Sequence, residues 1–212
     1  MNLQNYYYYF QNALTPRFCD ELVKYGIAQQ EQLAITGGQT EKINKGKPLD
    51  DKDIVDLKKK RDSNIVWLND RWIYKEIQPF IHQANRLAGW NFDWDFSESC
   101  QFTKYKLNQF YDWHCDSWDA PYANKDNKDT YGKIRKLSVT CSLSDPKDYK
   151  GGELEFDFRN MDPDKKNIRK CAEISPRGSI VVFPSHVWHR VKPVTKGRRY
   201  SLVIWNLGYP FR

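Results

Sequence analysis

The second half of the chain shows a repeated alternation of apolar and polar residues. Because successive side chains of a β-strand point to opposite faces, a period of two predicts strands that bury one face. Residues 137–143 and 153–158 follow this period, whereas the runs at 180–183 and 200–207 are apolar on both faces, as in central strands. Turns that contain Gly and Pro separate these segments. This half of the chain therefore predicts a series of short strands.

The first half of the chain has a different pattern, in which apolar residues recur at helical spacing. Thr15-Pro16 predicts an N-cap followed by a proline in the first turn, and we expect Gly26 to end or interrupt this helix. A second helix is predicted over residues 72–84. An aromatic run at residues 6–10 favours a strand before both helices.

Helices followed by many short strands predict a mainly β fold. We expect a β-sandwich or jelly roll with the N-terminal helices packed outside it. The length of 212 residues allows one well-buried core and is short for two full domains. We therefore interpret residues 1–212 as a single domain, in which residues 1–97 supply a strand and supporting helices and residues 98–207 form the core.

The cysteine pattern and the charge narrow the class of protein. Five Cys, an odd number without a CxxC pair, argue against a disulfide framework and a structural zinc site, so we expect a cytoplasmic, intracellular protein with free thiols. No apolar run is long enough to cross a membrane, and the first residues lack a secretory pattern. The net charge of +7 permits acidic partners, but the basic residues are mixed with Asp and Glu, so nucleic acid is not favoured.

A candidate metal site contains two histidines and one aspartate. His114 and Asp116 lie in the strand-like stretch 110–118, where positions two apart share a face. A third ligand has to come from elsewhere, and the sequence offers His189 or His186 after a buried run. Two histidines and one carboxylate are the ligand set of non-haem Fe(II) oxygenases, which leave the other metal positions open. An HxD pair alone also occurs on ordinary strands, so the distal partners decide the interpretation.

Arg199 and Ser201 form a candidate anion clamp. They lie two residues apart in the last predicted strand, so they share a face, which we assign to the interior together with Val203 and Trp205. A planar guanidinium beside a hydroxyl is well suited to hold a carboxylate through charge-assisted hydrogen bonds.

In this order and spacing the motifs resemble those of the 2-oxoglutarate/Fe(II)-dependent dioxygenases, most closely the prolyl 4-hydroxylase-like branch. The matching segments lie within residues 98–207 and are Tyr105-x5-Tyr111-x2-His114-x-Asp116, Gly151-Gly152-Glu153-Leu154, Phe183-Pro184-Ser185 and His189-x3-Pro193-Val194-Thr195-x-Gly197-x-Arg199-x-Ser201. The resemblance implies a double-stranded β-helix, that is a jelly-roll core, which agrees with the strand pattern.

The resemblance also implies the metal ligands. His114, Asp116 and His189 would hold Fe(II), and the segment after His189 favours it over His186. Halogenating relatives lack the carboxylate ligand, so the presence of Asp116 favours hydroxylation.

The same resemblance assigns the co-substrate site. Arg199 would hold the distal carboxylate of 2-oxoglutarate, and Tyr105 would contact the same molecule. Ser201 and Trp205 would be further wall residues. Trp205 stands where the related nucleic-acid demethylases have a second arginine, which disfavours them.

The implied reaction is the hydroxylation of a substrate with Fe(II), 2-oxoglutarate and O₂, with ascorbate as an additional candidate cofactor and succinate and CO₂ as co-products. A peptidyl proline is the favoured substrate, which makes a peptide or protein the expected partner. Two alternatives stay open: an oxygenase that acts on a small molecule or a nucleic-acid base, and a jelly-roll binding module without catalytic activity. The sequence does not indicate the oligomeric state. Two polar segments are candidate lids: residues 36–63, with a short helix at 49–60, and residues 119–135.

Overall fold

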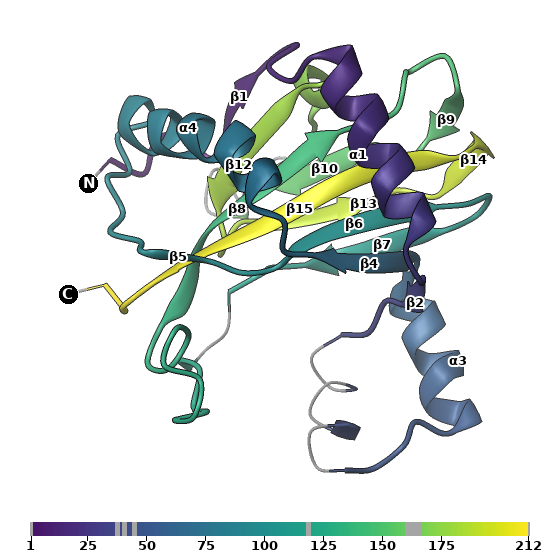
Figure 1. The fold of residues 1–212 in the computed structure, drawn as a ribbon, viewed down its shortest axis with the longest axis horizontal. Helices are drawn as coiled ribbons and strands as arrows, with labels where there is room; N and C mark the ends of the chain where they lie inside the picture. Colours follow the sequence, from purple (N-terminus) through teal and green to yellow (C-terminus); the bar gives the residue numbers. More distant parts are fainter. Residues whose placement is uncertain are drawn as a thin grey trace.

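The computed structural model shows antiparallel sheets stacked as a sandwich, with helices on the outer side of the larger sheet (Figure 1). It describes residues 2–36, 39, 42–43, 46–117, 120–159 and 167–211. The predicted mainly β fold with helices packed outside is confirmed.

The larger sheet forms the centre of the fold. Its strands follow the order β1 (Tyr8–Phe10), β12 (Ile180–Pro184), β8 (Ile134–Ser142), β15 (Arg199–Gly208), β6 (Cys100–Tyr105), β4 (Asn64–Leu68) and β2 (Gln32–Leu33), and β5 (Phe96–Ser97) also pairs with β15. β15 lies between neighbours on both sides, as its continuous apolar run predicts. β1, β4 and β2, from residues 1–97, thus form the two edges of a sheet whose central strands come from residues 98–207.

The smaller sheet faces the larger one and carries most of the histidine motif. Its order is β11 (Ile168–Lys170), β10 (Leu154–Asp157), β13 (Trp188–Val191), β7 (Phe110–His114) and β3 (Arg61–Asp62). A separate pair is formed by β9 (Tyr149–Gly151) and β14 (Val194–Gly197), and a short 3-10 helix, η1, covers Ala172–Ile174. A cluster of buried side chains that includes Leu154, Phe156, Val181 and Phe183 fills the space between the two sheets.

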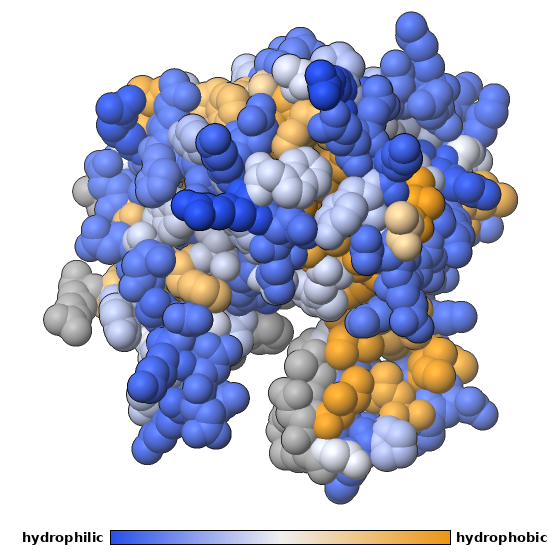
Figure 2. Space-filling model, viewed as in Figure 1, coloured by the Kyte–Doolittle hydropathy of each residue, from blue (hydrophilic) through white to orange (hydrophobic). Residues whose placement is uncertain are grey.

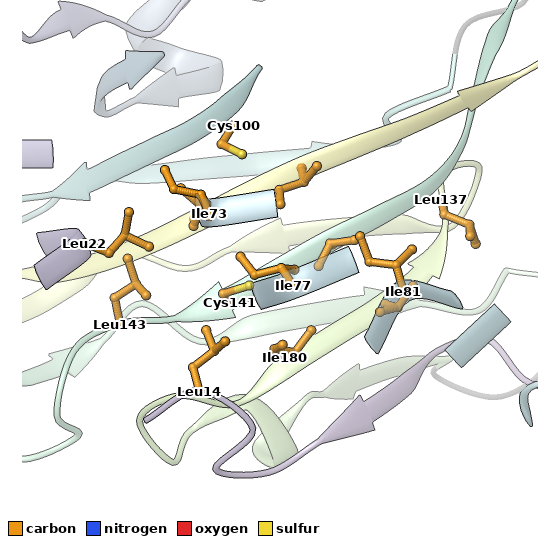
Figure 3. Close-up of a cluster of buried hydrophobic side chains, with 14 of the residues drawn as sticks. Leu14, Leu22, Ile73, Ile77, Ile81, Cys100, Leu137, Cys141, Leu143 and Ile180 are labelled. Atoms are coloured by element: carbon orange, nitrogen blue, oxygen red, sulfur yellow. The ribbon is translucent and has the colours of Figure 1, made fainter. Parts of the chain in front are cut away.

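Two long helices cover the outer face of the larger sheet. α4 (Arg71–Leu87) turns Ile73, Ile77 and Ile81 toward the strands, where they join a cluster with Ile180 (Figure 3). These isoleucines share one helix face because they are spaced by four residues. Each fully buried side chain of this size contributes about 1.5–3 kcal/mol to folding. α1 (Pro16–Ala28) packs Leu22 into the same cluster.

α1 begins where the sequence predicts but does not end there. The side chain of Thr15 accepts a hydrogen bond from the backbone N–H of Phe18 at 3.1 Å, which caps the first turn. The expectation that Gly26 ends or interrupts the helix is wrong, because the helix continues to Ala28. Gly26 serves close packing instead: a Cβ at this position would lie 2.6 Å from Cδ1 of Phe102 in β6.

Gly26→Ala is therefore expected to destabilise the protein by about 1–3 kcal/mol, because the added methyl group forces the buried Phe102 ring to move. This loss opposes the higher helix propensity of alanine, which alone would stabilise the helix. Urea unfolding monitored by circular dichroism measures the effect, with Lys24→Ala on the exposed face of α1 as the matched control. A Gly26→Ala variant more stable than the natural protein would contradict this account.

A third helix, α3 (Asp51–Lys60), agrees with the short helix predicted at 49–60. Asp50 and Asp53 form a capping box at its start. Within the described residues, α3 and the segment 120–133 project from the same side of the sandwich, and a hollow separates them (Figures 1 and 2). Residues 37–38, 40–41, 44–45 and 118–119, which belong to or adjoin the two candidate lids, lie outside the described residues. No helix in the described part of the chain is long and apolar enough to span a bilayer.

Candidate metal centre

His114 and His189 meet because their strands pair. His114 is the last residue of β7, His189 lies in β13, and the antiparallel register places them opposite each other. Their ring centroids are 4.1 Å apart. The carboxylate oxygens of Asp116 lie 3.8 Å from Nε2 of His114 and 3.5 Å from Nε2 of His189. Together the three side chains offer three donor atoms within 4.8 Å of one another, which fits one metal ion.

Asp116 reaches this point through a turn and not through the strand that the sequence predicts. The expected strand over residues 110–118 ends at His114, so an alternation of faces does not place the carboxylate. The backbone instead turns toward β12, where the carbonyl of Ser185 accepts hydrogen bonds from the N–H groups of Asp116 (2.8 Å) and Ser117 (3.0 Å). The turn after β7 is thereby fixed to the other sheet, and the side chain points between the two histidines.

Both imidazole rings are oriented by backbone carbonyls. Nδ1 of His114 lies 2.7 Å from the carbonyl oxygen of Asp112, and Nδ1 of His189 lies 3.0 Å from that of Val187. A neutral ring that donates its Nδ1–H to a carbonyl has its Nε2 lone pair free. Both free nitrogens face the Asp116 carboxylate, which is the arrangement a metal requires.

The electrostatic environment favours the metal-binding protonation states. Burial, with a smaller contribution from the neighbouring His189, lowers the pKa of His114 to about 3, so the ring is neutral near pH 7. Burial alone would raise the pKa of Asp116, but electrostatic interactions with the two imidazole rings and with Arg135 keep this pKa below its usual value. The carboxylate is therefore ionised and the His114 nitrogen is available.

His186 does not join this cluster. His186 lies in the turn between β12 and β13, and its exposed side chain lines a small pocket of about 130 Å³ together with Asn5 and Tyr6. The geometry thus brings His189, and not His186, to His114 and Asp116.

Arg199 lies inside the sandwich, as the sequence analysis expects. Its side chain is buried, its Nη1 donates to the hydroxyl of Ser201 at 3.2 Å, and its guanidinium carbon lies 5.4 Å from the centre of the Tyr105 ring. Arg199 and Tyr105 are direct partners across β15 and β6. No carboxylate of the described residues forms an ion pair with Arg199. A buried cation of this kind needs an anion, because burying an uncompensated charge is costly.

The structure explains why the second residue of the Gly151-Gly152 motif is a glycine. Its φ of +67° lies in the left-handed region that favours glycine. A Cβ at Gly152 would lie 2.8 Å from Cδ of Arg199 and 3.1 Å from Cγ2 of Val194. The absence of a side chain therefore makes room for the Arg199 stem.

Trp205 lies on the same face of β15 as Arg199 and Ser201. It contacts Arg135, a residue that the sequence analysis missed. The guanidinium carbon of Arg135 stacks 3.9 Å from the centre of the Trp205 ring. Arg135 donates to both oxygens of Glu98, at 3.0 and 2.5 Å, and the hydroxyl of Tyr122 donates to Glu98 at 2.7 Å. The segment 120–133 is thus tied to the interior at its base. In the sequence, the only indication of the interior position of Arg135 is its place just before the predicted strand 137–143.

Arg61, at the end of α3, is a second residue that the sequence analysis missed. Its guanidinium carbon lies 4.4 Å above the Tyr111 ring, and Tyr111 in turn stacks on His114 with 3.5 Å between ring centroids. Arg61 is buried, and its Nη2 has no hydrogen-bond partner among the described atoms. In the sequence Arg61 lies in the polar segment 36–63, and its burial depends on a contact that composition does not show.

A jelly-roll interior with two converging imidazoles, one ionised carboxylate and a separate buried arginine is the arrangement of the non-haem iron oxygenases. Comparison with known sequences supports the same class. The chain belongs to the 2OG-Fe(II) oxygenase superfamily, whose sequence profile matches residues 100–206, half of the chain. Membership in this family implies Fe(II) and 2-oxoglutarate as its cofactor and co-substrate.

Curated relatives carry the description PKHD-type hydroxylase. The protein of Pseudoalteromonas atlantica is 33% identical over 107 residues, which are 50% of this chain and 41% of that protein. The protein of Hyphomonas neptunium is 41% identical over 70 residues, which are 32% of this chain and 27% of that protein. The chain therefore matches less than half of the length of these relatives.

Solved structures of prolyl hydroxylases share the fold. The viral collagen prolyl hydroxylase of Paramecium Bursaria Chlorella virus-1, in complex with 2OG, superposes with a TM-score of 0.63 at 20% identity, over 97% of each chain. The prolyl hydroxylase of Trichoplax adhaerens, in complex with a peptide fragment of the hypoxia inducible factor oxygen degradation domain, gives a TM-score of 0.61 at 17% identity, over 96% of this chain and 84% of that one. The predicted double-stranded β-helix is thereby confirmed.

Proposed function

We propose that this chain is a Fe(II)- and 2-oxoglutarate-dependent hydroxylase in which His114, Asp116 and His189 hold the iron. One observation carries the proposal: their donor atoms converge within 4.8 Å, in a sandwich that also buries an arginine without a carboxylate partner in the described part of the chain. Bound iron and 2-oxoglutarate would supply the oxidising chemistry that inserts an oxygen atom of O₂ into a C–H bond, with succinate and CO₂ as co-products.

The chain's own residues would position the co-substrate and exclude water. Arg199 and Ser201 would hold the distal carboxylate, since a guanidinium beside a hydroxyl provides several charge-assisted donors. Tyr105 lies against this guanidinium and is buried, so it forms the adjoining wall. Trp205 continues the wall toward Arg135. A dry, enclosed site of this kind strengthens each electrostatic contact inside it.

We infer that the substrate is a peptidyl proline in a peptide or protein. Two buried donors lack a partner among the described atoms, Nη2 of Arg61 and Nε1 of Trp205, and backbone carbonyls of an extended peptide are suitable acceptors for both. Arg61 directly follows α3, and Arg135, which stacks on the Trp205 ring, lies in β8 two residues after the 120–133 segment. Both projecting segments therefore end close to these donors in the sequence. The described parts of the two segments, which belong to the predicted lids, would flank the peptide (Figure 2).

Mass spectrometry of proline-containing peptides, incubated with the protein, Fe(II), 2-oxoglutarate, O₂ and ascorbate, tests this proposal. We expect a peptide product heavier by one oxygen atom and an equal amount of succinate, with ascorbate sustaining turnover by keeping the iron reduced. Succinate formation without any hydroxylated peptide would favour a small-molecule or nucleic-acid substrate. No succinate with the metal bound would indicate a binding module.

Gly152→Ala is expected to raise the KM for 2-oxoglutarate about tenfold, because the new Cβ displaces the Arg199 side chain and small displacements in a positioned site have effects of this order or larger. Initial rates at varied 2-oxoglutarate concentration measure the effect. Gly46→Ala is the matched control, since Gly46 also has a positive φ (72°) but a Cβ there would meet nothing within 4 Å. An unchanged KM for Gly152→Ala would show that Arg199 does not contact the co-substrate.

A further inference from the structure

An open pocket of about 570 Å³ lies away from the metal centre, on the helix side of the larger sheet. His82 and Asn85 of α4 line one side of it, and the chain between α4 and β5 lines another. The last described residues after β15 complete it, and in Figure 1 these segments lie together near the C-terminus. The volume is in the range of pockets that bind small molecules.

A β-bulge turns one lysine into this pocket. In the pairing of β8 with β15, Asn206 is opposite Leu137 and Leu207 is opposite Arg135, so Lys136 is the extra residue. A bulge redirects side chains, and here it separates two neighbours. Arg135 contacts Trp205 in the interior of the sandwich, whereas Lys136 lines the pocket on the opposite face of the strand.

Lys136 is 5% exposed, and its ammonium group forms no hydrogen bond or ion pair with any described residue. It lies 4.5 Å from the centre of the Phe211 ring. Burial lowers the pKa of this ammonium, and the more distant carboxylates of Asp93 and Asp95 offset the effect only in part. The described residues thus supply no anion that would compensate the desolvation of this charged group.

The rest of the pocket supplies an aromatic surface and one free carboxylate. Trp94 stacks on His82 with 4.5 Å between ring centroids, and the buried Phe92 adjoins it. Asp95 is paired with Lys133 at 2.7 Å, whereas Asp93 has no ion pair among the described residues. Within the described part of the chain, the pocket therefore presents one cation and one anion without ion-pair partners, together with apolar ring surfaces.

We propose that this pocket binds a small aromatic zwitterion, such as a free aromatic amino acid. The carboxylate of the ligand pairs with Lys136, its ammonium group pairs with Asp93, and its ring packs against Trp94 and Phe92. A ligand with both charges matches the net charge of the site, and an anion or a cation alone would leave one protein charge unpaired. Binding here involves neither the iron nor 2-oxoglutarate.

Isothermal titration calorimetry with L-phenylalanine as the probe tests the proposal on the whole chain. L-Phenylalaninamide, which lacks the carboxylate, and N-acetyl-L-phenylalanine, which lacks the ammonium group, are the matched ligands. We expect L-phenylalanine to bind at least tenfold more tightly than either analogue. Lys136→Met should abolish the preference over the amide, and Asp93→Asn should abolish the preference over the N-acetyl compound. Lys150→Met, an exposed lysine outside this pocket, should bind as the natural protein does.

Both variants are expected to fold, because Asp93 is exposed and Lys136→Met keeps an aliphatic side chain of similar length. If one of them did not fold, the other would still test the proposal. A shift of the Trp94 indole N–H resonance on addition of L-phenylalanine locates the binding. No binding by the natural protein, equal affinity for the three ligands, or full binding by Lys136→Met would overturn the proposal.

Discussion

Asp116→Ala is expected to reduce turnover by at least a factor of about 10³, since it removes one of three metal ligands without opening a large cavity. The fold should persist, because the turn at residue 116 is held by backbone hydrogen bonds to Ser185 and not by the carboxylate. Metal content and the metal-induced rise in Tm measure the loss directly. A ligand at a hundred times its Kd stabilises the folded state by about 2.7 kcal/mol, and this gain should vanish.

Asp148→Ala is the matched control for this experiment, since that aspartate is exposed and lies outside the metal centre. Within the histidines, His189→Ala should resemble Asp116→Ala, whereas His186→Ala should keep most of the activity because His186 lines a separate small pocket. The reverse order of the two histidine variants would assign the third ligand to His186 and contradict the geometry.

Arg199→Ala is expected to weaken 2-oxoglutarate binding by a factor of about 100, while the KM for the peptide changes little. Removing one partner of a buried, hydrogen-bonded charge pair costs about 2–5 kcal/mol, and a factor of about 100, or about 2.7 kcal/mol, lies in the lower part of this range. Arg199→Lys should recover only part of the affinity, because an ammonium group lacks the planar fork that engages both carboxylate oxygens. Titration of the protein with 2-oxoglutarate in the presence of Mn(II) separates binding from turnover.

The neighbouring residue provides the control, since Arg198 carries the same side chain but is exposed. Arg198→Ala should bind 2-oxoglutarate as the natural protein does. Comparison of the unfolding midpoints separates a loss of binding from a loss of structure in Arg199→Ala. Equal co-substrate affinity in Arg199→Ala and the natural protein would remove Arg199 from the proposed clamp.

The residues that the sequence could locate are those whose position follows from a local period or from a motif. The apolar run of β15 predicted a central strand and placed Arg199 and Ser201 on one interior face. The isoleucines of α4 indicated its buried side in the same way. In both cases the side-chain direction depends only on the spacing along one element.

The residues that the sequence could not locate depend on contacts between distant segments. Asp116 was placed near the histidines by the assumption of a continuous strand, whereas its actual position depends on hydrogen bonds to the carbonyl of Ser185, which directly follows β12 of the opposite sheet. Gly26 resembled a helix end because the ring that it accommodates, Phe102, lies in a different element. Arg61 could not be distinguished from the other charged residues of the segment 36–63 for the same reason. No periodicity along a single segment contains this information.

The column formed by Arg61, Tyr111 and His114 joins a projecting helix to the first metal ligand through stacked planar groups. Because Arg61 directly follows the last residue of α3 and caps its C-terminus, unravelling of the last helical turn would uncover the phenol ring and admit water beside the ligand imidazole. Hydrogen exchange in α3 and the absorption bands of a cobalt-substituted centre should then respond together to the same perturbation. In that case α3 would exclude water from the metal centre, and fraying of its last turn would be detectable in the spectrum of the bound metal.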